Sequence, residues 1–221
     1  MWRGEPQFAP LQYHKMSNIS DEYKTVTSEV AEGFYSEKRS KFFAFVHHVT
    51  SESDIKNIIA AYHKSHYDAR HICYAYVLGP DKAHFRANDD GEPSSTAGKP
   101  ILGQIIKNDL TDILVVVIRY YGGVNLGTSG LIVAYRTAAA DAISSAKIVS
   151  KQVEETVKLK FPYELTNSVM KIVKELSARI LSNEYNNDNM CDMTLSVRKS
   201  QAEILRSKFK HLTLLRNLDV R

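Results

Sequence analysis

NDDGEPSSTAGKPILGQIIKNDLTDILVVVIRYYGGVNLGTSGLIVAYR, residues 88–136, is the stretch that decides the fold. Its middle, from Asp112 to Tyr120, is a nearly continuous run of aliphatic residues, which predicts a strand buried on both faces. Loops rich in small residues lie on both sides of this run. We expect one helix over residues 97–108 before the strand and another over residues 126–146 after it.

Neither loop matches an established nucleotide-binding motif. In the first loop, Pro93 stands at the first glycine position of a phosphate-binding P-loop, and Pro100 stands where the Mg²⁺-binding Ser or Thr belongs. The second loop, GGVNLGTSG, lacks the Gly-x-Gly-x-x-Gly spacing of a dinucleotide-binding fold. What remains is an anion-binding site, which backbone N–H groups at a helix start near Arg119 favour.

The candidate site residues come from these loops and from the charges around them. We expect the anion or nucleic-acid site to comprise Lys99, Arg119, Gly122, Gly123, Gly127, Thr128 and Arg136. The signature loop before it comprises Asp89, Asp90, Gly91, Glu92, Pro93, Ser94, Thr96 and Gly98. The cluster SEKRSK is typical of a solvated turn; its alternative role is a secondary basic contact through Lys38, Arg39 and Lys41. Strand alternation should bury one of Tyr120 and Tyr121 and expose the other, and both are possible stacking platforms for bases.

Two blocks of the chain carry a family resemblance. DDGEPSSTAGKPIL followed by VVVIRYYGGVNLGTSGLIVAYRTA resembles the signature of the YigZ/IMPACT family, and KRSKFFAFV and HICYAYVLG extend the match to most of the chain after Lys15. The resemblance implies a β-α-β module shared with a small-subunit ribosomal protein and domain IV of elongation factor G. Ser95 and Ser129 stand where many relatives have glycine, so a positive φ at either position would strain it.

Composition excludes several classes of protein. The 221-residue chain is long enough for one or two domains with a substantial core. Cys73 and Cys191 have no CxxC partner, and the histidines form no HExxH motif, so we expect no disulfide framework, no metal and no cofactor. No apolar run approaches the ~20 residues of a membrane span, and we expect a cytoplasmic protein. The net charge of +4 is too small to indicate a nucleic-acid binder by itself.

The sequence predicts an α+β protein with two domains. Residues 1–15 lack periodicity and are interpreted as a tail or an expression-derived extension, so the N-terminal domain covers residues 16–149. It is expected to contain strands from Tyr23 and Lys41, a helix from Ser51 to His66 and a strand from His71 to Gly79.

Near Ser150 the pattern restarts, and residues 150–221 form the second domain. Its segments are EETVKLKFPY, YELTNSVMKIVKELSA, ARILSNEYNN, NMCDMTLSVRKS, SQAEILRSKFKHL and TLLRNLDVR. Their order, β-α-β-β-α-β, predicts a ferredoxin-like domain. Bacterial YigZ-type relatives are similar in carrying such a module, whereas eukaryotic IMPACT proteins place a different domain at the N-terminus.

Three functions fit these observations. We favour a non-enzymatic protein associated with translation, which docks RNA or the ribosome at the anion-binding site. A phosphate-directed or metal-dependent hydrolase is an alternative, with Arg119 and Lys99 on a phosphate and Asp89, Asp90 or Glu92 as metal ligand or general base. No Ser-His or Cys-His pair is apparent, so we assign no catalytic residue.

The third function is protein–protein regulation, and it comes from the resemblance alone. Eukaryotic IMPACT relatives bind the ribosome-associated activator of a starvation-responsive initiation-factor kinase, which implies a translation-regulatory partner for this chain. The first and third functions therefore both point to translation.

Overall fold

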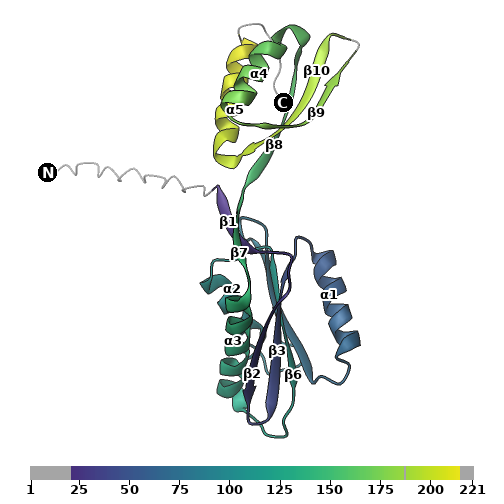
Figure 1. The fold of residues 1–221 in the computed structure, drawn as a ribbon, viewed down its shortest axis with the longest axis vertical. Helices are drawn as coiled ribbons and strands as arrows, with labels where there is room; N and C mark the ends of the chain where they lie inside the picture. Colours follow the sequence, from purple (N-terminus) through teal and green to yellow (C-terminus); the bar gives the residue numbers. More distant parts are fainter. Residues whose placement is uncertain (1–20, 187, 215–221) are drawn as a thin grey trace, which may run out of the picture. The chain divides into compact units, whose positions relative to one another are not determined.

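The structure, a computed structural model, describes residues 21–186 and 188–214. These residues form two compact units that meet in the sequence between Glu155 and Thr156 (Figure 1). The predicted tail, residues 1–15, lies outside the described residues. The strands of the first unit are β1 (Glu22–Val26), β2 (Ala31–Glu37), β3 (Ser40–His48), β4 (His71–Leu78), β5 (His84–Asn88), β6 (Ile113–Tyr120) and β7 (Ile148–Gln152). Its helices are α1 (Glu52–Ser65), α2 (Gly98–Lys107) and α3 (Gly127–Ser145).

The first unit is built on a five-stranded sheet with the order β2-β3-β6-β4-β5. The aliphatic run of the sequence forms β6, the middle strand, which pairs antiparallel with β3 on one side and β4 on the other. Val115 and Val117 of β6 face one hydrophobic core, and Leu114 and Val116 face another. Helices α2 and α3 cover the first face and α1 covers the second (Figure 1). A strand covered on both faces needs apolar residues at every position, which explains the unbroken run.

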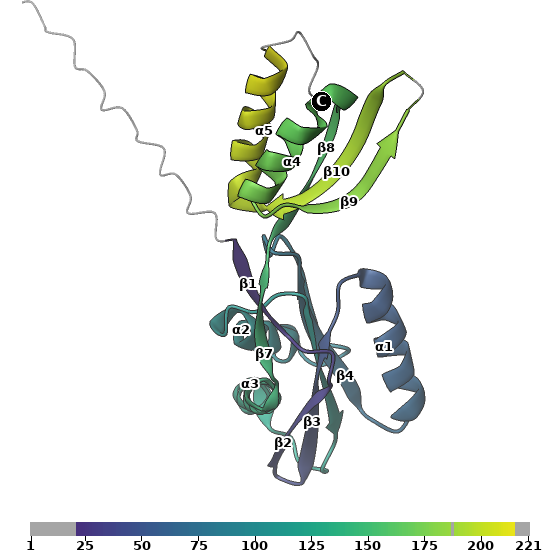
Figure 2. The ribbon, with the colours of Figure 1, turned by 45° about the horizontal axis from the view of Figure 1, so that its top comes forward.

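Three short strands of this unit were not predicted. Strands β2 and β5 form the two edges of the sheet. Strand β7 pairs with β1 in a separate two-stranded sheet (Figure 2). Edge strands carry mixed, partly solvated residues, so their hydrophobic pattern is weak. The cluster SEKRSK contains the tight turn between β2 and β3, where Lys38 and Arg39 have φ values of 45° and 65°.

The second unit contains a three-stranded sheet covered by two helices. Its elements are β8 (Glu154–Pro162), the short 3-10 helix η1 (Tyr163–Leu165), α4 (Thr166–Glu175), β9 (Arg179–Tyr185), β10 (Met190–Arg198) and α5 (Lys199–Leu214). The sheet order is β8-β10-β9, and α4 and α5 pack on one face of it (Figure 2). The last predicted strand, TLLRNLDVR, does not begin where expected, because Thr213 and Leu214 belong to α5. Residues 215–221 lie outside the described residues.

Candidate anion-binding site

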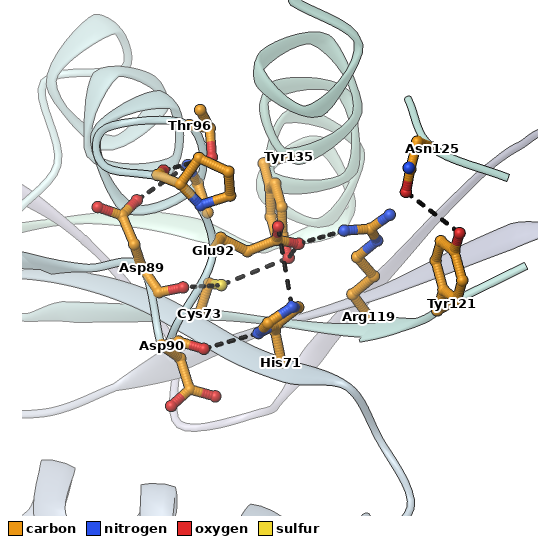
Figure 3. Close-up of polar contacts among 12 residues, drawn as sticks. His71, Cys73, Asp89, Asp90, Glu92, Thr96, Arg119, Tyr121, Asn125 and Tyr135 are labelled. Carbon is orange, nitrogen blue, oxygen red and sulfur yellow. Dashed lines mark hydrogen bonds and ion pairs between the residues drawn. The ribbon is translucent and has the colours of Figure 1, made fainter. Parts of the chain in front are cut away.

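The signature loop is held in place by its own acidic side chains. Asp89 Oδ1 accepts hydrogen bonds from the backbone N–H groups of Ala97 (3.0 Å) and Gly98 (2.8 Å), and Oδ2 accepts one from Ser95 (2.9 Å). These are N–H groups at the start of α2 that have no acceptor within the helix. Asp89 therefore caps α2 (Figure 3), and its carboxylate is already occupied by backbone donors.

The neighbouring acid has a similar structural role. Asp90 Oδ2 accepts a 2.6 Å hydrogen bond from the backbone N–H of Ile72 on β4. Thr96 is buried, and its hydroxyl donates to the carbonyl of Pro93 at 2.6 Å. Within the described residues, no group of three or more His, Cys, Asp or Glu side chains is arranged to hold a metal ion. Asp89 and Asp90 thus stabilise the loop rather than point into open space.

Glu92 is the centre of a buried polar network. Its side chain is 3% exposed, and its Oε1 accepts from Arg119 Nη1 at 2.6 Å and from the Tyr135 hydroxyl at 2.8 Å (Figure 3). Its Oε2 lies 3.8 Å from Nε2 of His71. His71 Nδ1 is 2.7 Å from the carbonyl oxygen of Asp90, and a carbonyl only accepts, so Nδ1 carries a hydrogen. The remaining nitrogen of His71, Nε2, therefore faces Glu92.

Arg119 is held by this network and by two aromatic rings. Its guanidinium carbon lies 5.6 Å from the ring centroid of Phe42 and 5.5 Å from that of Tyr121. Its side chain is 7% exposed, and within the described part of the chain its Nε has no hydrogen-bond partner. The free positive charge that the sequence predicted is thus paired with Glu92. A buried donor without an acceptor is rare in folded proteins.

Cys73 and Tyr135 complete the network beneath Glu92. Cys73 Sγ lies 3.0 Å from the carbonyl oxygen of Asp89 and 3.4 Å from the Tyr135 hydroxyl. Burial raises the pKa of the Cys73 thiol, and burial together with the neighbouring thiol raises the pKa of Tyr135. Both groups are neutral at physiological pH, so neither is an activated nucleophile.

A cavity of about 700 Å³ opens above this network. Its wall includes Gly127 and Thr128 in the first turn of α3, and the N-cap residue of that helix, Leu126, provides no side-chain cap. First-turn N–H groups lack intrahelical acceptors and carry the positive end of the helix dipole. The exposed Arg70 lines the same cavity, as do parts of His71 and Arg119. Four kinds of donor or positive group thus border one cavity, which we call the anion pocket.

The structure brings some of the predicted residues together and leaves others apart. Gly91, Glu92, Pro93, Arg119, Gly127 and Thr128 line the anion pocket. Lys99 and Arg136 are exposed on α2 and α3 and are not among its lining residues, nor are Gly123 and the exposed Ser94. His71, Cys73 and Tyr135 were missed, because their approach to Glu92 depends on strand register. The signal available was the strand HICYAYVLG, in which His71 and Cys73 point to the same face.

Gly122 has a packing role instead of a binding role. A Cβ at this position would lie 2.1 Å from the carbonyl carbon of Arg39, so any side chain would displace the β2–β3 turn. Its N–H donates to the hydroxyl oxygen of Ser40 at 3.1 Å. The expectation that this amide is open to an anion is therefore corrected.

The two serines at glycine positions differ. Ser95 has a φ of 65°, in the left-handed region that favours glycine. Ser129 lies inside α3 and is absent from the residues with positive φ. Only the first substitution places a non-glycine residue in a strained backbone conformation.

The fold and the pocket define a class, a mixed α/β protein of two units with a polar pocket at the start of one helix. The model of the Impact N-terminal domain matches residues 38–143, a range that includes every residue of the anion pocket. Among the described residues, no helix is both long and apolar enough to cross a lipid bilayer.

Two curated proteins and one solved structure place the chain more closely. It is 32% identical over 150 residues to the IMPACT family member YigZ of Escherichia coli, covering 67% of this chain and 74% of that protein. It is 38% identical over 115 residues to the IMPACT family member YvyE of Bacillus subtilis, but the match spans only 53% of that protein. The crystal structure of a hypothetical protein is similar with a TM-score of 0.66 and 25% identity, covering 91% of this chain and 96% of that one. The chain belongs to the IMPACT family, as the two signature blocks predicted.

Proposed function

We propose that this chain is a non-enzymatic, translation-associated protein that docks RNA, in the context of the ribosome, at the anion pocket. The observation that carries the proposal is the convergence of donors on one cavity. The first turn of α3, the exposed Arg70 and part of the Arg119 side chain all line it. Phosphate oxygens are the acceptors that such helix starts and guanidinium groups bind in proteins.

The acidic residue of the pocket does not oppose this assignment. Glu92 already accepts from Arg119 and Tyr135, so its charge is compensated within the protein. Arg70 and the helix dipole then contribute the positive potential that reaches the ligand. Contacts of this kind orient a nucleic-acid backbone but do not distinguish bases, so we expect affinity without strict sequence preference.

The link to translation is supported by membership in the IMPACT family. The hydrolase alternative has less support, because the acids assigned to it are occupied: Asp89 by three amides, Asp90 by one and Glu92 by the ion pair. The alternative of a protein partner in a translation-control kinase pathway rests on family membership alone.

Co-sedimentation with purified bacterial ribosomes tests the proposal. Thr128→Asp places a carboxylate in the pocket at a helix start, where an acidic residue is favourable, so it blocks anions without weakening α3. Arg70→Glu reverses the exposed charge. The matched controls are Ser53→Asp, in the corresponding first turn of α1, and Lys56→Glu, also on α1.

We expect the wild type and both controls to sediment with ribosomes at low salt and both pocket variants to remain in solution. Affinity for a single-stranded RNA should fall about sevenfold between 50 and 200 mM salt if two phosphates are bound. Binding that is unchanged by Thr128→Asp, or that does not respond to salt, would contradict the proposal.

A further inference from the structure

A second cavity shares one residue with the anion pocket. This groove, of about 480 Å³, is lined by rings, of which Phe43 and Phe45 come from β3, Tyr120 from β6 and His66 from the end of α1. Tyr121 lines both cavities. We call the second cavity the aromatic groove.

The rings of the aromatic groove hold one another in position. Phe43 and Tyr120 meet edge to face, with centroids 5.9 Å apart, and His66 Nδ1 lies 2.8 Å from the Tyr120 hydroxyl. The centroids of Phe45 and His66 are 6.4 Å apart. Such mutual contacts leave few rotamers open, so the groove is preorganised. A ligand that enters it does not have to order the side chains first.

The charge at the groove indicates what enters it. Arg39 and Lys41, two of the residues predicted as a basic contact, line the groove, and no acidic side chain is among its lining residues. Tyr121 is 47% exposed, and its ring stands between this groove and the guanidinium of Arg119, at 5.5 Å. Its hydroxyl donates to Asn125 Oδ1 at 3.2 Å, which fixes the orientation of the ring. A ligand that spans both cavities therefore needs an anionic group joined to a flat, largely apolar one.

We infer that the aromatic groove binds one unpaired nucleobase of a single-stranded RNA whose adjacent phosphate lies in the anion pocket. This inference rests on the proposed function and adds the strandedness of the ligand and the position of a base. Aromatic side chains stack on any base face, and Arg39 and Lys41 then meet the next phosphate along the strand. In an RNA duplex the bases are stacked on one another, so a duplex presents no free base to the groove.

Fluorescence anisotropy with three labelled RNAs tests the inference on the full chain. The probes are a uridine oligomer of about ten nucleotides, an abasic ribose-phosphate oligomer of the same length, and a duplex. The variants are Tyr121→Leu, at the wall that both cavities share, and Phe43→Leu, at a residue that lines the aromatic groove but not the anion pocket. Phe85→Leu on β5, an exposed ring that lines neither cavity, is the matched control, and thermal melting checks that each variant is folded.

We expect the uridine oligomer to bind about tenfold more tightly than the abasic oligomer and the duplex, as one stacked base predicts. In both groove variants the affinities for the uridine and abasic oligomers should become equal, whereas Phe85→Leu should keep the tenfold difference. If the wild type binds the uridine and abasic oligomers equally, or if both groove variants keep the tenfold difference, the inference that the groove binds a base is wrong. Either result would leave the proposed phosphate binding at the anion pocket unaffected. Absence of binding to all three RNAs would overturn the proposed function itself.

Discussion

The buried ion pair between Glu92 and Arg119 leads to the most precise prediction. The pair joins the signature loop to β6. Glu92 Oε1 lies 2.6 Å from Arg119 Nη1, and the side chains are 3% exposed at Glu92 and 7% exposed at Arg119. Replacement of Glu92 by Gln keeps the size of the side chain and an acceptor for Tyr135, but it leaves the guanidinium without a counterion. Removing one partner of a buried pair costs about 3–5 kcal/mol, and Arg119→Met should cost a similar amount.

The double variant measures the interaction free energy of the pair itself, apart from the contacts that each residue makes with its surroundings. Glu92→Gln together with Arg119→Met removes both charges, so its cost should be smaller than the sum of the single costs by about 2 kcal/mol or more. Because a chain of two units need not unfold in one step, the free energy is best measured by native-state hydrogen exchange of the β6 amides. These amides lie at the centre of the first unit and report its opening.

An exposed ion pair serves as the control. Lys82 and Asp109 also form a salt bridge, but their side chains are 34% and 69% exposed. Asp109→Asn should therefore cost less than about 1 kcal/mol. Single costs below 1 kcal/mol at Glu92 and Arg119, or costs that simply add, would refute the reasoning, since they would mean that the pair is not desolvated.

Three further predictions concern other parts of the chain. Ser95→Gly should stabilise the protein by about 0.5–1 kcal/mol because it relieves a left-handed backbone, whereas Ser129→Gly should destabilise it by about 0.5 kcal/mol because it weakens α3; urea unfolding compares the two. Cys73 and Cys191, whose pKa values burial raises, should both resist Ellman's reagent at pH 8 and react in denaturant, and labelling of either native thiol would contradict this. Burial lowers the pKa of His47 in the folded state below its ordinary value. The stability that the neutral imidazole contributes is therefore complete above about pH 6.5 and is lost as the pH falls through the folded-state pKa. NMR titration of His47 measures the pKa shift, and His47→Gln should make the free energy of unfolding depend less on pH below pH 6.5.

Much of the fold was readable from local patterns. The aliphatic run over Asp112–Tyr120 predicted the middle strand β6, and the helices α2 and α3 begin and end within one residue of the predicted ranges. These elements have strong periodicity or composition because they are buried. Strands β2, β5 and β7 were missed because their residues are exposed or half-exposed and mixed in character.

Only some of the residues that line the candidate site were predicted, and the contacts among them were not. Arg119, Glu92 and the start of α3 were all identified, and they do line one pocket. That Glu92 neutralises Arg119 was not predicted, because 26 residues separate them between the signature loop and β6. The pairing of β4 with β6 sets His71 directly opposite Arg119, and no sequence pattern encodes that register.

The sequence by itself determined the buried strand, the two helices beside it and the membership in the family, because each depends on residues that are consecutive in the chain. Only the tertiary structure decided which charges are compensated and which remain available to a ligand. Compensation depends on distance and burial, and both are set when loop, strands and helix pack together. The free first turn of α3 and the ring of Tyr121 between two cavities are products of that packing.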